Sequence, residues 1–396
     1  MPVSHTLDAT DHTGLVIIGT GMAGVGLARA LRRLNDRRAI TLISADSGDD
    51  YSKPLLSTGL AKRLLPDQLA QRSAAMLADE LDARVMRHTH VEQLTPATRT
   101  IRLSDGQLLG YDTLVLATGA APQAPFAIPE SLSRRFFTVN DLDDYRRFRA
   151  ALDERPARVA IIGAGLVGCE FANDLHAGGH QVTLVAPESA PLARLLPEPL
   201  GAALGSAFQD AGIQLALGRK LVDISAGSDN AVRLTLDDHA ILEVDLVLLA
   251  TGLAPRTALA DAAGLDISRY GVTVDRYLRS SNPHIYALGD VACVTGVNAM
   301  YVQPLQASAK ALAATLAGTP TQVSFGAWPI IVKTPLLPVV AYPPAASVER
   351  WRIEGEGGDM TALGEDKQGN LVGFALTGGC VRRKVELSRA APVLLG

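Results

Sequence analysis

The chain has 396 residues, enough for two or three domains at roughly 150 residues each. Its 47% apolar and 20% charged residues are ordinary for a globular protein, and a net charge of −4 lacks the basic excess typical of nucleic-acid-binding proteins. Three cysteines, Cys169, Cys293 and Cys380, lie far apart, which excludes a disulfide framework and fits a reducing compartment.

Neither targeting nor membrane signals are expected. Residues 1–14 are polar and contain no apolar core segment, so we expect a loose tail there and no signal peptide. No run of about 18 or more apolar residues is free of charges and turn glycines, so we predict no membrane span. We therefore expect a cytoplasmic protein that has no nucleic-acid partner and no membrane span.

The first motif is an apolar run, residues 15–18, that opens into Gly19, Gly21 and Gly24 and then into a helical pattern. Gly19 would allow a sharp turn, Gly21 would let the backbone approach a pyrophosphate, and Gly24 would let the helix pack against the strand. The helix N-terminus would offer unpaired N–H groups to phosphate oxygens. Glycine-rich turns also serve packing alone, so one copy of this motif is weak evidence for nucleotide binding.

The second predicted strand, residues 39–44, ends near Asp46, which lies 22 residues past Gly24. This offset is close to the roughly 20 residues expected for an acid that binds a nucleotide ribose. A turn-forming Asp in a polar loop is the alternative for Asp46. Further on, Pro54 fixes a turn, and Lys53 is either a surface lysine lying along apolar neighbours or a cation held near a cofactor.

Short alternating strands between residues 85 and 103 place His88 and His90 on one face. Two histidines without acidic or cysteine partners at ligand spacing are typical of packing residues. We therefore predict no metal site.

The opening pattern returns 144 residues later, at residues 158–168, with Gly163, Gly165 and Gly168 and a matching second strand at residues 181–185. A packing turn does not explain the duplication of a whole strand–glycine–helix–strand unit. The sequence therefore predicts two nucleotide-binding units. Glu170 is expected in the first turn of the second helix, where an acid complements the helix dipole.

Each unit ends with a predicted strand that runs into the same Ala-Thr-Gly signature. The two copies are Ala117-Thr118-Gly119 and Ala250-Thr251-Gly252. A later strand, residues 285–288, ends in Gly289-Asp290. Asp290 could cap the next helix or accept hydrogen bonds from ligand hydroxyls. A helix is expected over residues 303–317, and the last 75 or so residues read as a smaller α+β domain with proline-rich turns and a terminal helix near residues 383–391.

Together, the two Gly-x-Gly-x-x-Gly units, both Ala-Thr-Gly ends and Ala287-Leu288-Gly289-Asp290 resemble the two-dinucleotide-binding-domain flavoproteins, over nearly the whole chain. Residues 51–59, 168–175 and 332–335 narrow the resemblance to the rubredoxin–NAD reductases, which lack the redox disulfide of the wider superfamily. The implied fold is α/β, with two Rossmann-like domains and a small C-terminal α+β domain. The implied boundaries are 1–121 and 255–321 for the FAD-binding domain, 122–254 for the inserted NAD-binding domain and 322–396 for the interface domain.

The resemblance implies that Asp46 contacts the adenosine ribose of FAD and Asp290 its ribityl chain. Lys53 and Lys333 would be catalytic cations near the flavin, where they could stabilise the negative charge of the reduced ring. The full set expected at FAD is Gly19, Gly21, Met22, Ala23, Gly24, Asp46, Lys53, Pro54, Ala117, Thr118, Gly119, Gly289, Asp290 and Lys333. The set expected at NAD is Gly163, Gly165, Leu166, Val167, Gly168, Glu170, Glu188 and Gly252.

The preferred coenzyme is expected to be NADH. NADPH would need a basic group at the end of the second strand of its unit, where the chain reads Ala186-Pro187-Glu188-Ser189 and the first arginine is Arg194. Glu188 could accept hydrogen bonds from a ribose and would repel a 2′-phosphate. Ala186 stands where the usual acid would directly follow the strand.

A thiol mechanism is disfavoured, because no cysteine precedes Cys169. The Ser-Cys-Gly segment of single-cysteine relatives reads Ser57-Thr58-Gly59 here. Cys169 falls in the nucleotide helix, where a small buried residue is its expected role.

The implied activity is transfer of hydride from NADH to FAD and then of single electrons to rubredoxin, a small acidic iron protein. Lys62-Arg63 and Arg382-Arg383-Lys384 are candidates for docking that partner, although such charge clusters often form solvated faces. Two alternatives remain open: an NADH:ferredoxin reductase of an oxygenase system, and a flavin- and NADH-binding redox sensor without turnover.

Overall fold

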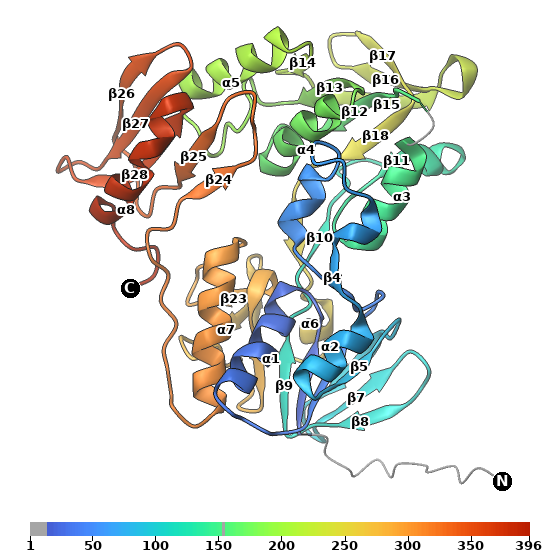
Figure 1. Cartoon of the computed structure of the whole chain (residues 1–396), viewed down its shortest axis with the longest axis vertical. Helices are drawn as coiled ribbons and strands as arrows, with labels where there is room; N and C mark the ends of the chain where they lie inside the picture. The colour runs from blue at the N-terminus through green and yellow to red at the C-terminus, as the bar shows by residue number, and fades with distance from the viewer. Residues whose placement is uncertain (1–13, 153–154) are drawn as a thin grey trace.

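The computed structural model describes residues 14–152 and 155–396. Figure 1 shows an elongated molecule whose lower half holds the N-terminal segment and helix α7 (Val302–Leu316) and whose upper half holds two further sheets side by side. The predictions of a loose N-terminal tail and of no signal peptide concern residues 1–14, which lie almost wholly outside the described ranges. Among the helices of the described residues, none combines the length and apolarity that a membrane crossing needs.

The sheet of the lower half has five parallel strands in the order β22-β9-β1-β2-β5. Their bounds are β1 Leu15–Ile18, β2 Ile40–Ile43, β5 Arg84–Met86, β9 Thr113–Leu116 and β22 Ile285–Ala287. Every residue of β1 and β2 is buried, as expected for strands that are covered on both faces. Strand β22 joins from far along the chain, so the chain leaves this sheet and later returns to it.

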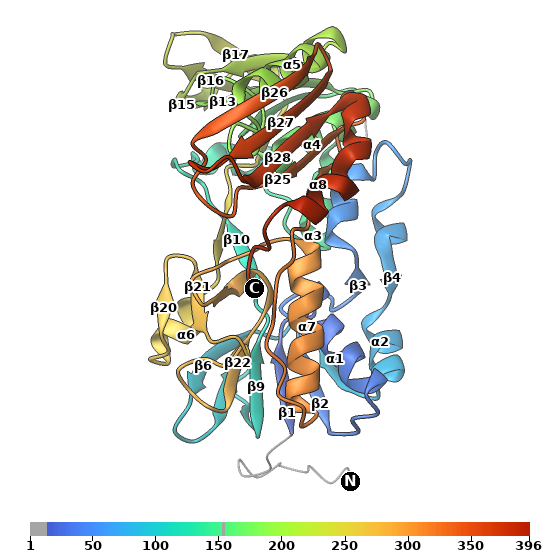
Figure 2. The same cartoon turned by 90° about the vertical axis from the view of Figure 1, so that its left-hand side faces the viewer.

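Helix α1 (Met22–Arg33) packs against α7 on one face of this sheet, and both views show the two helices side by side (Figures 1 and 2). The two helices approach each other at Gly26, where a Cβ would make an ordinary van der Waals contact of 3.7 Å with the Cβ of Ala309. The predicted helix over residues 303–317 is thus confirmed to within one residue.

The second sheet repeats the arrangement, with five parallel strands in the order β11-β18-β12-β13-β14. Their bounds are β11 Phe136–Phe137, β12 Arg158–Ile162, β13 Gln181–Ala186, β14 Gln214–Leu217 and β18 Leu246–Leu249. Helices α4 (Leu166–Ala177) and α5 (Glu198–Asp210) belong to this unit, with an antiparallel group of β15 (Leu221–Ala226), β16 (Val232–Leu236) and β17 (Ile241–Val244).

Two short strands, β10 (Ala120–Pro122) and β19 (Leu253–Pro255), pair antiparallel and carry the chain between the two parallel sheets. Each begins just after one of the two Ala-Thr-Gly signatures. The two nucleotide-type units are therefore joined at the strand ends where the sequence predicts cofactor contacts.

The C-terminal segment forms a five-stranded antiparallel sheet in the order β24-β25-β28-β27-β26. Its elements are β24 Ile330–Val332, β25 Val339–Tyr342, β26 Arg350–Glu356, β27 Asp359–Glu365, β28 Leu371–Thr377 and helix α8 Lys384–Ala390. Figure 2 shows this sheet standing above α7. The predicted α/β fold with two Rossmann-like units and a small α+β domain is confirmed.

The remaining elements are short, and they connect these three parts or lie at their edges. The strands are β3 Asp50–Tyr51, β4 Ala70–Arg72, β6 Val91–Thr95, β7 Thr100–Leu103, β8 Leu108–Gly110, β20 Ile267–Ser268, β21 Gly271–Val274 and β23 Ala292–Val294. The α-helices are α2 Ala74–Leu81, α3 Leu142–Leu152 and α6 Ala258–Ala262. The 3₁₀ helices are η1 Lys53–Thr58, η2 Pro66–Leu69, η3 Glu130–Arg135, η4 Ser228–Asn230, η5 Gly289–Val291 and η6 Gly378–Arg383.

Candidate functional site

The first glycine turn has the geometry that a pyrophosphate site needs. Gly19 has a φ of +118°, and a Cβ there would lie 2.2 Å from the carbonyl oxygen of Ala117. A Cβ on Gly24 would lie 2.0 Å from the carbonyl oxygen of Gly19, so this glycine lets α1 pack against the turn. At Gly21, which directly precedes α1, a Cβ would meet nothing within 4 Å. Two glycines therefore serve the turn, and the third leaves open space at a helix N-terminus.

The second glycine turn repeats these relationships. Gly163 has a φ of +113°, and its Cβ would lie 2.4 Å from the carbonyl oxygen of Ala250. A Cβ on Gly168 would lie 1.9 Å from the carbonyl oxygen of Gly163, whereas one on Gly165 would meet nothing within 4 Å. Leu166 and Val167 begin α4, as Met22 and Ala23 begin α1.

The Ala-Thr-Gly signatures lie directly against these turns, because Ala117 and Ala250 supply the carbonyls that crowd Gly19 and Gly163. The two closing glycines, Gly119 and Gly252, have φ values of +67° and +110° and face open space. The structure therefore brings each signature to the glycine turn of its own unit.

Arg256, which sequence reasoning did not single out, follows β19 and bonds to the first signature. Its backbone N–H donates to the Gly119 carbonyl at 3.0 Å, and its Nη1 donates to the Thr118 carbonyl at 3.2 Å. Arg256 is exposed, and the positive charge of its guanidinium helps to lower the pKa of Lys53.

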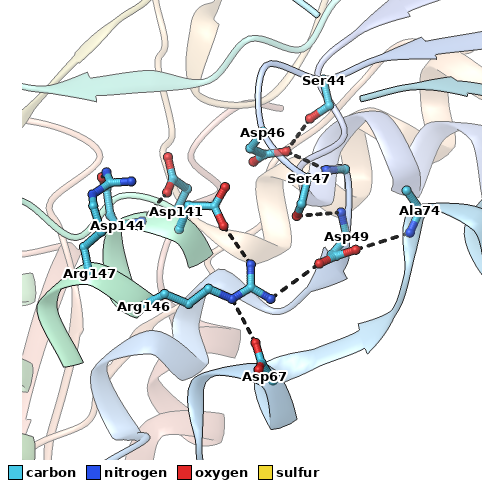
Figure 3. Close-up of polar contacts among 12 residues, drawn as sticks. Ser44, Asp46, Ser47, Asp49, Asp67, Ala74, Asp141, Asp144, Arg146 and Arg147 are labelled. Atoms are coloured by element: carbon cyan, nitrogen blue, oxygen red, sulfur yellow. Dashed lines mark hydrogen bonds and ion pairs between the residues drawn. The ribbon is translucent and has the colours of Figure 1, made fainter. Parts of the chain in front are cut away.

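Asp46 is connected to the first turn by a chain of hydrogen bonds. Thr20 Oγ1 donates to Ser44 Oγ at 2.6 Å, and Ser44 Oγ donates to Asp46 Oδ1. The backbone N–H of Gly48 also donates to Asp46 Oδ1, at 2.9 Å. Figure 3 shows Asp46 across from Asp141, just before α3, and burial raises the pKa of Asp141 while the Asp46 carboxylate adds to that rise. One oxygen of Asp46 is thus anchored to the turn.

Helix α3 is tied to the first segment of the chain through Arg146 (Figure 3). Its guanidinium lies 2.7 Å from Asp143 Oδ1, 2.9 Å from Asp67 Oδ1 and 3.6 Å from Asp49 Oδ2. These ion pairs hold the start of the second unit beside the loop that carries Asp46.

Lys53 begins η1, with Pro54 behind it, and its Nζ donates a hydrogen bond of 2.7 Å to Asn140 Oδ1. Burial lowers the pKa of Lys53, while the Asp290 carboxylate opposes that shift. Burial likewise raises the pKa of Asp290, opposed by Lys53. Asp290 makes no side-chain cap to the short helix η5, so the capping alternative is not what the structure shows. The structure therefore brings Lys53 and Asp290, 237 residues apart in the sequence, near enough for their charges to interact.

Lys333 follows β24 and lies in a separate buried network. Its Nζ is 2.7 Å from Glu170 Oε2 and 2.7 Å from Ser57 Oγ, and it also donates to the carbonyl of Pro54. Ser57 Oγ donates to Glu170 Oε2 at 2.7 Å, and the Lys333 backbone N–H donates to Glu170 Oε1 at 3.1 Å. These contacts join η1, α4 and the C-terminal sheet at one point.

The expectation that Glu170 lies in the first turn of its helix is wrong. Helix α4 begins at Leu166 and has no acid in its first turn, so Glu170 stands one turn further on. Only 4% of Glu170 is exposed, and its carboxylate serves the network with Lys333 and Ser57.

The same face of α4 makes two further contacts between parts of the chain. Asn173 Oδ1 accepts from the backbone N–H of Leu336 at 3.3 Å. The carboxylate of Asp174 accepts from the backbone N–H groups of Leu60 and Ala61, at 3.2 Å and 2.8 Å. Burial raises the pKa of Asp174, and these backbone donors oppose the rise.

At the second turn, Glu188 stands two residues past β13 and is half-buried. Its backbone carbonyl accepts from the N–H of Gly218 at 2.8 Å, which fixes the loop that carries its side chain. Ala186, the last residue of β13, is fully buried.

The thiols of the three cysteines are buried or half-buried. Cys169 is fully buried in α4, its Sγ donates to the Ala164 carbonyl at 3.3 Å, and burial raises the pKa of this thiol to about 12. Cys293 is buried in β23, and Cys380 is half-buried. Within residues 14–152 and 155–396, no three His, Cys, Asp or Glu side chains gather as a metal site would require.

Of the candidate docking residues, Lys62, Arg63 and Arg382 are exposed. Arg383 instead pairs within its own domain, at 3.0 Å from Glu354 Oε2 and 3.6 Å from Glu386 Oε1.

Comparison with known proteins finds two family matches along the chain. Residues 13–314 match the pyridine nucleotide-disulphide oxidoreductase family, and residues 322–391 match the rubredoxin binding C-terminal domain. The chain is 42% identical to a rubredoxin-NAD(+) reductase from Alcanivorax borkumensis, over 96% of this chain and 99% of that protein. It is 39% identical to a protein of the same name from Acinetobacter baylyi, over 96% and 98%. A nitric oxide reductase FlRd-NAD(+) reductase from Shigella dysenteriae is 36% identical, over 96% and 99%.

Two solved structures share the fold. One is the covalent complex of putidaredoxin reductase with putidaredoxin, with a TM-score of 0.86 and 24% identity over 96% of this chain and 94% of that chain. The other is a ferredoxin reductase from Rhodopseudomonas palustris, with a TM-score of 0.86 and 25% identity over 96% of both chains.

Proposed function

This chain belongs to the pyridine nucleotide-disulphide oxidoreductase family, and we propose that it passes electrons from NADH through FAD to a rubredoxin. The observation that carries the proposal is the pair of matching glycine turns, each with one glycine facing open space. The match of residues 322–391 to a rubredoxin-binding domain supports the choice of acceptor. The resemblance expected from residues 51–59, 168–175 and 332–335 is thereby confirmed.

The residues of the first unit fit FAD. Gly21 leaves room for a pyrophosphate at the N-terminus of α1, and Met22 and Ala23 present the first N–H groups of that helix. Asp46 has one carboxylate oxygen anchored to the turn and the other available for an adenosine ribose. Asp290, whose carboxylate lies near enough to Lys53 for their charges to interact, is the acceptor proposed for ribityl hydroxyls.

The residues of the second unit fit NADH. Gly165 leaves the corresponding space at the N-terminus of α4, and Gly252 faces open space beside it. Glu188 is the acceptor proposed for the ribose hydroxyls, and its negative charge disfavours a 2′-phosphate. Glu170 contributes by holding α4 to Lys333.

When bound, FAD supplies the chemistry that joins a hydride donor to a one-electron acceptor. The chain positions the two nucleotides and provides two lysines, Lys53 and Lys333, whose charge can stabilise the anion formed on reduction. A buried Cys169 thiol with a pKa of about 12 is a poor nucleophile, which supports a route without thiols. Three separate free cysteines fit a reducing compartment, and we place the reaction in the cytoplasm.

The experiment that tests the proposal is steady NADH-dependent reduction of purified rubredoxin by the FAD-loaded protein, with a [2Fe–2S] ferredoxin in parallel. We expect rubredoxin to be favoured by ~10-fold or more in kcat/KM. A preference for ferredoxin would identify a ferredoxin reductase. A flavin that is reduced once without turnover would identify a redox sensor. Either result overturns the proposed acceptor.

Ionic strength tests the docking assignment separately. If Lys62, Arg63 and Arg382 steer an acidic rubredoxin, its rate of reduction should fall steeply as salt rises, because salt screens exposed charges. A flat salt profile would remove these residues from the docking surface while leaving the activity itself in place.

A further inference from the structure

Two half-buried lysines lie near the proposed flavin position, and their hydrogen-bond partners differ in charge. Lys333 is 2.7 Å from a Glu170 carboxylate oxygen, so its charge is compensated by a direct ion pair. Lys53 instead donates to the neutral amide oxygen of Asn140, at 2.7 Å. Within the described ranges, no carboxylate oxygen lies within 4 Å of Lys53 Nζ. Asp290, Asp141 and Asp144 act on Lys53 only from further away, and Arg256 adds a like charge.

The orientation of Asn140 is fixed by its other contacts. Only 6% of the residue is exposed, and its Nδ2 donates to the carbonyl of Ala120 in β10 at 3.1 Å. Its backbone N–H donates to Asp144 Oδ2 at 3.0 Å. A lysine ammonium can only donate, so the amide oxygen must face Lys53. Asn140 therefore holds Lys53 from a fixed position between β10 and α3.

The choice of residue type at this position matters, because Asn140 lies in the run Asn140-Asp141-Leu142-Asp143-Asp144. Three of the five residues are acids, yet the side chain that reaches Lys53 is the amide. An aspartate at this position would form a direct ion pair with the lysine and largely cancel its positive charge. The neutral acceptor orients the ammonium and leaves it without a carboxylate in direct contact.

We propose that Asn140 is a positioning residue that directs the charge of Lys53, which has no carboxylate in direct contact, at the flavin and so raises the reduction potential of the flavin. This inference rests on the proposed function, since it requires FAD in the first unit. Asn140 acts through Lys53, and its effect should appear in the reduction equilibrium of the flavin with little change in FAD content.

The first test measures the flavin midpoint potential of the FAD-loaded protein by equilibration with a reference dye at one pH. Asn140→Asp keeps the side-chain size and the acceptor but adds a carboxylate beside Lys53. We expect the equilibrium constant for reduction to fall about tenfold, which is about 30 mV for a two-electron couple. An unchanged midpoint overturns the proposal.

The second test is a double-mutant cycle, which isolates the coupling between two residues. Asn140→Leu removes the acceptor without adding charge, and it is combined with Lys53→Met. We expect Asn140→Leu to lower the midpoint in the parent and to cause no further change in the Lys53→Met background. An equal shift in both backgrounds would show that Asn140 acts independently of Lys53, which overturns the proposal.

The matched control is Asp141→Asn, which alters the adjacent side chain and keeps an N-cap type at the start of α3. Because it removes a negative charge, it should not lower the midpoint. A drop comparable to that of Asn140→Leu would point to loosening of the segment and overturn the proposal.

Rubredoxin reduction by the parent is measured separately. If the parent binds no FAD, the proposed function fails as well, whereas an active parent with unshifted variants refutes the role of Asn140 alone.

Discussion

Lys333 and Glu170, 163 residues apart in the chain, form an ion pair of 2.7 Å between the loop after β24 and the second turn of α4. The carboxylate is 5% exposed and the lysine 27%, and Ser57 from η1 completes the network. One buried pair therefore fixes the C-terminal sheet and both nucleotide-type units relative to one another. The position proposed for the flavin lies beside this point, because Pro54 accepts from Lys333 and follows Lys53.

Replacing Glu170 by Ala should destabilise the protein by about 3 kcal/mol, since loss of one partner leaves a largely buried charge unpaired. The change is measured by chemical unfolding of the FAD-loaded protein. The matched control is Glu354→Ala, which breaks the solvent-accessible pairs with Arg352 and Arg383 and should cost at most about 1 kcal/mol. Equal costs for the two variants would show that the Glu170 network does not hold the domains together.

The parts of the fold that were predictable from the sequence are those with local causes. The apolar runs at residues 15–18 and 158–162 form central parallel strands, and the glycines after them form the turns that their order predicts. These features depend on neighbouring residues, so their physical reasons can be read directly from the sequence. The duplication then indicates two units of one kind.

The parts that were not predictable depend on contacts between distant segments. Asn140 and Lys53 form a hydrogen bond although they lie 87 residues apart in the sequence. The residues around each of them do not indicate this contact. The sequence pattern predicts Glu170 at the helix start because this residue closely follows the glycine motif. In the structure its role is decided by Lys333, which comes from the C-terminal segment. Such pairs arise when the domains pack together.

Replacing Gly21 by Ala should weaken FAD binding without unfolding the chain. Gly21 has a φ of −66°, which alanine adopts readily, and the added Cβ would meet no protein atom within 4 Å. The methyl group would instead occupy the space proposed for the pyrophosphate. We expect FAD affinity to fall by ~10-fold or more, a loss of about 1.4 kcal/mol, and thermal unfolding of the FAD-free protein to be unchanged.

Gly24→Ala is the contrasting control, because its Cβ would lie 2.0 Å from the Gly19 carbonyl oxygen. This variant should lose about 1–3 kcal/mol of stability through overpacking. A Gly21→Ala protein that retains as much FAD as the parent would refute the assignment of the first turn.

Replacing Gly165 by Ala should weaken NADH binding while FAD is retained. The reason is the same open space at the start of α4, and alanine is compatible with the φ of −76° at this position. We expect the KM for NADH to rise by ~10-fold, with the flavin absorbance of the purified protein unchanged. Loss of FAD from this variant would contradict the assignment of the two turns to different nucleotides.

Alkylation at pH 8 should leave Cys169 unmodified in the folded protein. Burial raises the pKa of this thiol to about 12, so only ~1 in 10⁴ molecules carries the thiolate at that pH. Because the folded pKa lies above the ordinary value, the thiol favours folding below its unfolded pKa and loses that contribution as pH rises toward 12. Peptide mass spectrometry after iodoacetamide should find the half-buried Cys380 modified first, with NADH oxidation intact. Rapid modification of Cys169 together with loss of NADH oxidation would restore a thiol mechanism.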